Sequence, residues 1–130
     1  MEIYSTIQLQ LQEVFNKIND TSINLAGARN ELIKAEKYIE VLDKGYEEAK
    51  AAFQYVKKND VVSLSAYVDT ANRTDAFDKS RTDAKIAKLV WETKVKGFDK
   101  DMKGFKAQYA ALEAKMKAAS NNITNIEEAK

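Results

Sequence analysis

"LAGARNELIKAEKYIEVL", residues 25–42, has an apolar or small residue at every third or fourth position. Because an α-helix turns once in about 3.6 residues, this spacing puts all of them on one face of a helix. Alternation of threes and fours is also the repeat of a coiled-coil seam, along which two helices pack side by side. The residues of the series are Leu25, Ala28, Leu32, Ala35, Ile39 and Leu42.

The alternation continues in both directions without a slip, which predicts a helix much longer than the quoted stretch. Thr21 is the one polar residue in the series. A seam sustained over this many heptads is typical of a coiled coil. The further seam residues are Ile7, Leu11, Val14, Ile18 and Thr21 before the quoted stretch, and Tyr46, Ala49, Phe53 and Val56 after it.

Local signals predict where this helix begins and ends. Ser5 and Gln8 have the spacing of a capping box, which marks a helix start. At the other end two lysines precede Asn59, and cations stabilise the C-terminal end of a helix dipole while asparagine often closes it. We therefore expect one helix over residues 6–58.

The last third of the chain carries a second seam with the same alternation. It predicts another long helix over residues 76–126. The residues of this second seam are Trp91, Val95, Phe98, Met102, Phe105, Tyr109, Leu112, Met116, Ala119, Ile123 and Ile126.

The connecting segment, residues 59–75, has apolar residues at helical spacing, but their phase does not join the seam that follows. This favours a short third helix over 61–71 and a break near 72–74, with Thr74 or Asp75 capping the next helix. The residues out of phase are Val61, Leu64, Val68 and Ala71, against Phe77, Ala84 and Trp91 of the following helix.

Two arms of similar length joined by a short segment predict an all-α fold. We expect a single domain, residues 1–130, built as a long antiparallel helical hairpin with coiled-coil-like packing and forming part of a larger helical bundle. One register places large residues opposite small ones, although a shift of one heptad and pairing between chains stay open. It pairs Ala28 with Tyr109, Leu32 with Phe105, Ala35 with Met102, Ile39 with Phe98 and Tyr46 with Trp91.

The composition excludes several kinds of functional site. The chain has no cysteine and no histidine, so it holds no disulfide, no Cys/His zinc site and no Ser-His-Asp arrangement. Carboxylate neighbours such as Glu36 and Glu40 need a cleft for chemistry and are expected to be solvated surface residues. We expect no enzyme activity, no catalytic residue, no cofactor, no metal ligand and no small-molecule substrate.

Five residues are candidates for protein interaction. Ile86, Leu89 and Val90 lie away from the seam, which favours burial against the 61–71 segment or another subunit. Gly97 and Gly104 lie beside the seam in a row of small residues, and each costs a helix about 1 kcal/mol relative to alanine. Three interpretations stay open for the glycines: exposed accidents, the place where another helix from the tip or a second subunit comes close, or a local bend.

Charge is balanced overall but uneven along the chain. The net charge is +1, whereas residues 79–117 hold eleven Lys or Arg and five Asp or Glu. Nucleic acid and an anionic membrane are the partners that this stretch could suit, but the acidic residues of the first helix would lie alongside, so we do not expect either. No signal peptide and no apolar run of membrane-spanning length is visible, which indicates a cytoplasmic protein or part of an assembly made in the cytoplasm.

These observations favour a non-enzymatic structural or assembly protein, a helical hairpin that oligomerises or docks onto other subunits. Its expected partner is protein, either in a homo-oligomer or in a larger assembly. By analogy, a virion, secretion or scaffold component would suit this build. The alternative is an adaptor or chaperone that binds an amphipathic partner helix in a groove near residues 86–90.

Overall fold

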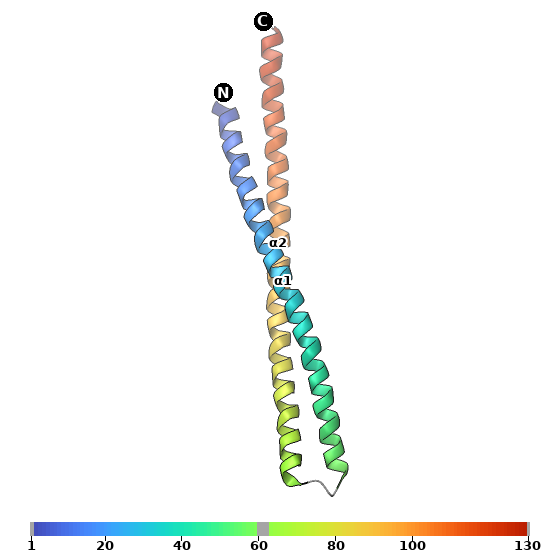
Figure 1. The fold of residues 1–130 in the computed structure, drawn as a ribbon. Coiled ribbons are helices and arrows are strands. Elements are labelled where there is room, and N and C mark those ends of the chain that lie inside the picture. Colours follow the sequence, from blue (N-terminus) through green and yellow to red (C-terminus); the bar gives the residue numbers. More distant parts are fainter. Residues whose placement is uncertain (1, 60–62, 130) are drawn as a thin grey trace. The chain divides into compact units, whose positions relative to one another are not determined.

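The computed structural model describes residues 2–59 and 63–129, with side chains described for 3–59 and 63–121. It contains two helices, α1 (Glu2–Lys58) and α2 (Leu64–Ala129), which pack against each other and are joined after Lys58 (Figure 1). The prediction of an all-α fold made of two long, packed helices is confirmed.

The chain divides into two compact units, each made of one segment from each helix. Unit 1 comprises the described residues of 1–27 and 94–130, and unit 2 comprises those of 28–93. In unit 1 the ring centroids of Phe15 and Tyr109 are 6.5 Å apart, and the Lys17 ammonium lies 5.8 Å from the Phe105 ring. Residue numbers therefore rise on α1 as they fall on α2, so the two segments are antiparallel.

Unit 2 has the same antiparallel arrangement. The rings of Phe53 and Tyr67 lie 5.2 Å apart near the connection, and Arg81 contacts Asp43 farther from it. The small hydrophobic cluster of this unit is made by Ile39, Leu42 and Ala84, with Phe77 packed against it.

The predicted seams are the contact faces of the helices. Every predicted seam residue of α1 is buried or half-buried, and so is every predicted seam residue of α2 from Trp91 to Ala119. The side chains of Ile123 and Ile126 lie outside the described residues. The buried members on α1 are Ile7, Val14, Thr21, Leu25, Ala28, Ile39, Leu42 and Ala49.

The connection is closed by a cap on each helix. The Asn59 side-chain amide donates a 2.7 Å hydrogen bond to the Tyr55 carbonyl, which satisfies an orphan acceptor at the end of α1 and confirms the predicted end. The Ser63 hydroxyl accepts a 3.2 Å hydrogen bond from the Ala66 amide, so Ser63 is the N-cap of α2. At the other end α1 already begins at Glu2, so Ser5 lies inside the helix and the predicted capping box is wrong.

The predicted third helix is absent from the described chain. α2 runs from Leu64 to Ala129 without the expected break near 72–74, so the predicted bounds of the last helix, 76–126, are also wrong. Thr74 does not cap a helix, because its hydroxyl donates to the Thr70 carbonyl one turn back, at 2.8 Å. Val61, which the short helix included, lies outside the described residues.

Polar seam residues explain why the sequence suggested a break. The face of α2 that continues the Trp91 seam toward the connection is buried or half-buried, but four of its positions are polar. The apolar Leu64 and Val68 instead face solvent, with 77% and 46% of their surface exposed. Hydrophobicity alone therefore selects the wrong face. The seam residues of this segment are Thr70, Thr74, Phe77, Arg81, Ala84 and Lys88.

The predicted register is also wrong. It placed Tyr46 opposite Trp91, whereas the Tyr46 ring lies 3.9 Å from the guanidinium carbon of Arg81. The contacts in both units place each α1 residue opposite an α2 residue about two heptads earlier than predicted. Seam periodicity is the same in every heptad register, so the spacing of the apolar residues does not choose among them.

Of the described glycines, Gly45 is the one at which a side chain would collide with another residue of the chain. A Cβ atom added there would lie 2.5 Å from Cε1 of Phe77, too close for any real contact. The Phe77 ring therefore packs directly on the backbone of α1, and a side chain at residue 45 would force the ring to move.

Alanine at Gly45 tests this contact, with Gly27→Ala as the matched control. We expect Gly45→Ala to lower the free energy of unfolding by about 1–3 kcal/mol, because Phe77 must leave the cluster. An added Cβ at Gly27 meets nothing within 4 Å, so that variant should gain about 1 kcal/mol from helix propensity. Urea unfolding, followed by circular dichroism, measures the free energy of unfolding of both variants. Equal gains in stability would contradict the packing of Phe77 on Gly45.

Candidate interaction surfaces

The three apolar candidates on α2 are exposed in unit 2. Ile86, Leu89 and Val90 expose 56%, 60% and 49% of their surface. Their spacing puts them side by side on the helix, away from the seam. Burial against the 61–71 segment is wrong, because the described part of that segment belongs to the same continuous helix and cannot fold back onto it.

Other large apolar residues are exposed around the same unit. Ile33, Tyr38 and Val41 of α1 expose 50%, 55% and 66% of their surface. None of the large side chains in the described chain is fully buried. Packing of α1 against α2 thus leaves several large apolar side chains of one unit in water. Folded monomers normally expose such side chains singly and scattered.

Gly97 and Gly104 of unit 1 face open space. A Cβ atom added at either position meets nothing within 4 Å. Close approach of another helix from the same chain is therefore excluded in the described structure, and a second subunit is the remaining way to use this row of small residues.

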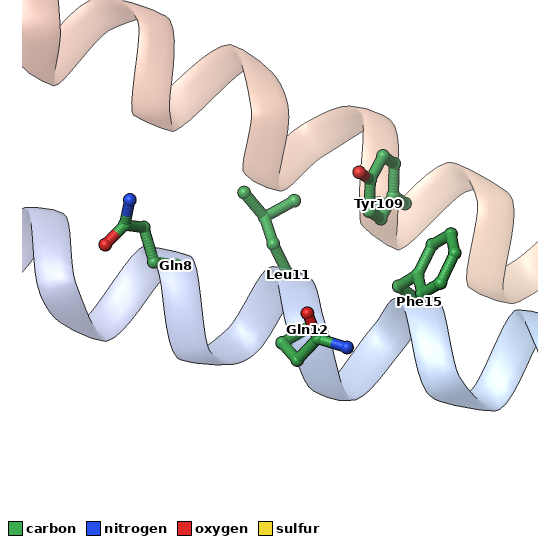
Figure 2. A pocket seen from close by; sticks show the side chains of 5 residues that line it. All are labelled: Gln8, Leu11, Gln12, Phe15 and Tyr109. Carbon is green, nitrogen blue, oxygen red and sulfur yellow. The ribbon is translucent and has the colours of Figure 1, made fainter.

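Unit 1 also holds a hollow of about 500 Å³ between its two helical segments, which the sequence did not indicate. Leu11 points from α1 toward α2, and Phe15 lies beside Tyr109 (Figure 2). Phe15 is 53% exposed, so an apolar side chain from outside could reach it. The other lining residues are Gln8 and Gln12 of the glutamine-rich stretch 8–12, so the lining carries amides and apolar groups but no charge.

Part of the basic stretch is neutralised within unit 2. Arg81 lies 3.6 Å from a carboxylate oxygen of Asp43 and 3.3 Å from one of Asp78. The Lys88 ammonium lies 3.7 Å from Glu92. Of these acidic partners only Asp43 lies on α1, whereas Asp78 and Glu92 belong to α2 itself.

The described residues form neither a metal-binding cluster nor a helix that could span a membrane. Across 3–59 and 63–121, where side chains are described, no three or more acidic side chains come together in a way that could hold a metal ion. Neither helix, as far as its residues are described, has a stretch long and apolar enough to cross a membrane.

Comparison with protein-family models, with curated proteins and with solved structures gives no match for this chain.

Replacing both Gly97 and Gly104 by alanine tests the row of small residues. In an isolated chain the added methyl groups meet open space, so the free energy of unfolding should rise by about 1–2 kcal/mol from helix propensity. Against a helix of another subunit the same groups force the helices apart, and we expect the oligomer mass to fall. Thermal melts and light-scattering masses measure the two effects. A more stable variant of unchanged mass would show that neither glycine belongs to an interaction surface.

Proposed function

We propose that this protein is a non-enzymatic assembly module, a helical hairpin that associates with further copies of itself or docks onto other subunits. The observation that carries the proposal is the incomplete burial of its apolar residues. Two-helix packing leaves no large side chain of the described chain fully buried, while Ile86, Leu89 and Val90 lie together in solvent. A helix with apolar residues beyond its seam is typical of a multi-helix bundle or an oligomer.

The amount of exposed surface supports the same proposal. The chain has a solvent-accessible surface of 9683 Å² for a mass of 14.7 kDa. Folded monomers of this mass expose roughly 6,900 Å², from the general relation between mass and surface. The surplus is about 2,700 Å², and a standard interface takes about 800 Å² from each partner. The surplus surface is therefore larger than the area that a standard interface takes from one partner.

The patch formed by Ile86, Leu89 and Val90 is the proposed centre of the interface. Its three side chains are neighbours on one helix and belong to one unit, so they reach a partner without rearrangement. Large aliphatic side chains each contribute about 1.5–3 kcal/mol when they pass from water to a buried site. Such a patch is sufficient to anchor a contact with a helix of another subunit.

A second candidate function is supported by the hollow in unit 1, which is lined by other residues than the groove near 86–90 expected for an adaptor or chaperone. An adaptor or chaperone would bind an amphipathic helix of a different protein there, with an apolar side chain against Leu11, Phe15 and Tyr109. The uncharged lining suits the apolar face of such a helix. Unlike the assembly module, this protein would remain a monomer until its partner is added.

Replacing Ile86, Leu89 and Val90 together by serine tests the proposed interface. Because each tenfold change in affinity corresponds to about 1.4 kcal/mol, we expect the dissociation constant of the oligomer to rise at least tenfold. Sedimentation velocity over a range of concentrations measures it. Circular dichroism should show unchanged helix content, since all three residues are exposed.

The matched control replaces Leu9 and Ile23, which are 67% and 64% exposed on α1, by serine. This variant removes exposed apolar surface in unit 1 and should leave the dissociation constant within about twofold of the wild type. Equal loss of association in both variants would contradict an interface centred on the α2 patch. A wild-type chain that is monomeric at every concentration would contradict association of this protein with copies of itself.

A further inference from the structure

A charged residue occupies a seam position in unit 2. Arg81 continues the α2 seam, and only 23% of its side chain is exposed. Its Nε lies 3.6 Å from Oδ1 of Asp43, and its guanidinium carbon lies 3.9 Å from the centroid of the Tyr46 ring. Its Nη2 lies 3.3 Å from a carboxylate oxygen of Asp78. The contacts to Asp43 and Tyr46 join α2 to α1.

Asp43 is half-exposed, with 47% of its side chain open to water, but one oxygen of its carboxylate faces Arg81. Its Oδ1 atom is shielded from water and accepts no hydrogen bond. A buried carboxylate oxygen without a hydrogen bond is unfavourable unless a cation compensates it, and Arg81 is the cation beside it. A helix pairing that separates Arg81 from Asp43 therefore loses this compensation.

The contact between Gly45 and Phe77 lies next to this cluster on the same two helices. Phe77 packs against Ile39, Leu42 and Ala84, and its ring occupies the space where a side chain at residue 45 would begin. This second contact is steric, whereas the contact of Arg81 with Asp43 and Tyr46 is electrostatic.

We propose that Asp43, Tyr46 and Arg81, together with the Gly45–Phe77 contact, form a register lock that holds the hairpin in one of several heptad-related pairings. A heptad seam packs similarly after a slide of seven residues, so the seam alone does not choose a register. A buried polar group is the best-attested device for such a choice. The inference concerns pairing within one chain and does not depend on the proposed assembly function.

A slide of one heptad toward the connection breaks both parts of the lock. Arg81 would face Lys50 in place of Asp43, which exchanges attraction for repulsion. Phe77 would meet Ala52 in place of Gly45, so a methyl group would occupy the space of its ring.

A slide of one heptad in the other direction keeps a carboxylate but fails elsewhere. Arg81 would face Glu36, and Ile39 would replace the aromatic ring of Tyr46. Phe77 would meet Tyr38 in place of Gly45, so a large side chain would occupy the space of its ring. Each neighbouring register thus loses at least one contact that the observed one has.

Paired cysteines report the register, because the chain has no cysteine of its own. Ile39→Cys with Ala84→Cys joins two residues of one buried cluster and reports the observed register. Ile39→Cys with Trp91→Cys reports a slide of one heptad, since residue 91 lies about 10 Å farther along α2. A disulfide needs Cα atoms within about 7 Å, so the two pairs exclude each other in a rigid hairpin.

The experiment measures the intramolecular disulfide fraction of each pair at equilibrium in glutathione buffer. With Arg81 present, we expect the first pair to form at least tenfold more readily than the second. In Arg81→Leu, which places an apolar residue in the seam, we expect this ratio to fall at least fivefold while helix content is kept. Lys85→Leu, at an exposed position outside the seam, is the control and should keep the ratio.

An unchanged ratio in Arg81→Leu would overturn the proposal, because the connection alone would then set the register. If Arg81→Leu does not fold, the exchanged pair Asp43→Arg with Arg81→Asp decides. We expect Asp43→Arg alone to lower the ratio and the exchanged pair to restore it at least fivefold. A ratio that stays low in the folded exchanged pair, or that never falls in Asp43→Arg, would also overturn the lock.

Discussion

Burial of a single apolar seam between α1 and α2 is the interaction on which the rest of the structure depends. Two helices share one interface, so each seam side chain is covered by the partner helix on one side and stays close to water on others. This explains why the described seam residues are buried or half-buried while none of the large side chains that the structure describes is fully buried. The exposed apolar residues outside the seam are what a two-helix contact leaves uncovered.

The seam could be predicted from the sequence because its apolar residues keep their phase over most of both helices. The continuity of α2 could not, because Thr70, Thr74 and Arg81 place polar groups in its seam while Leu64 and Val68 face solvent. The register was unpredictable for a different reason, since all heptad-related pairings bury similar residues. The hollow beside Phe15 and Tyr109 depends on the separation of the helices, which residue spacing does not encode.

The polar seam residues and the exposed apolar residues have complementary roles in this account. Polar groups in the seam reduce the stability that the hairpin gains from its own packing but favour one register. Apolar groups outside the seam add nothing to the isolated hairpin but can stabilise it through association. Contacts within each unit thus determine how the two helices pair. In the proposed function, contacts with other subunits bury the apolar residues that these contacts leave exposed.

The central claim is that contacts with further copies of this chain complete the burial of its apolar residues. The most direct test measures the melting temperature and the sedimentation mass of the wild-type protein over a wide range of concentrations. Because association stabilises only the folded state, the account predicts a melting temperature that rises with concentration and a mass that is a multiple of 14.7 kDa. A concentration-independent melting temperature at a constant mass of 14.7 kDa would contradict it.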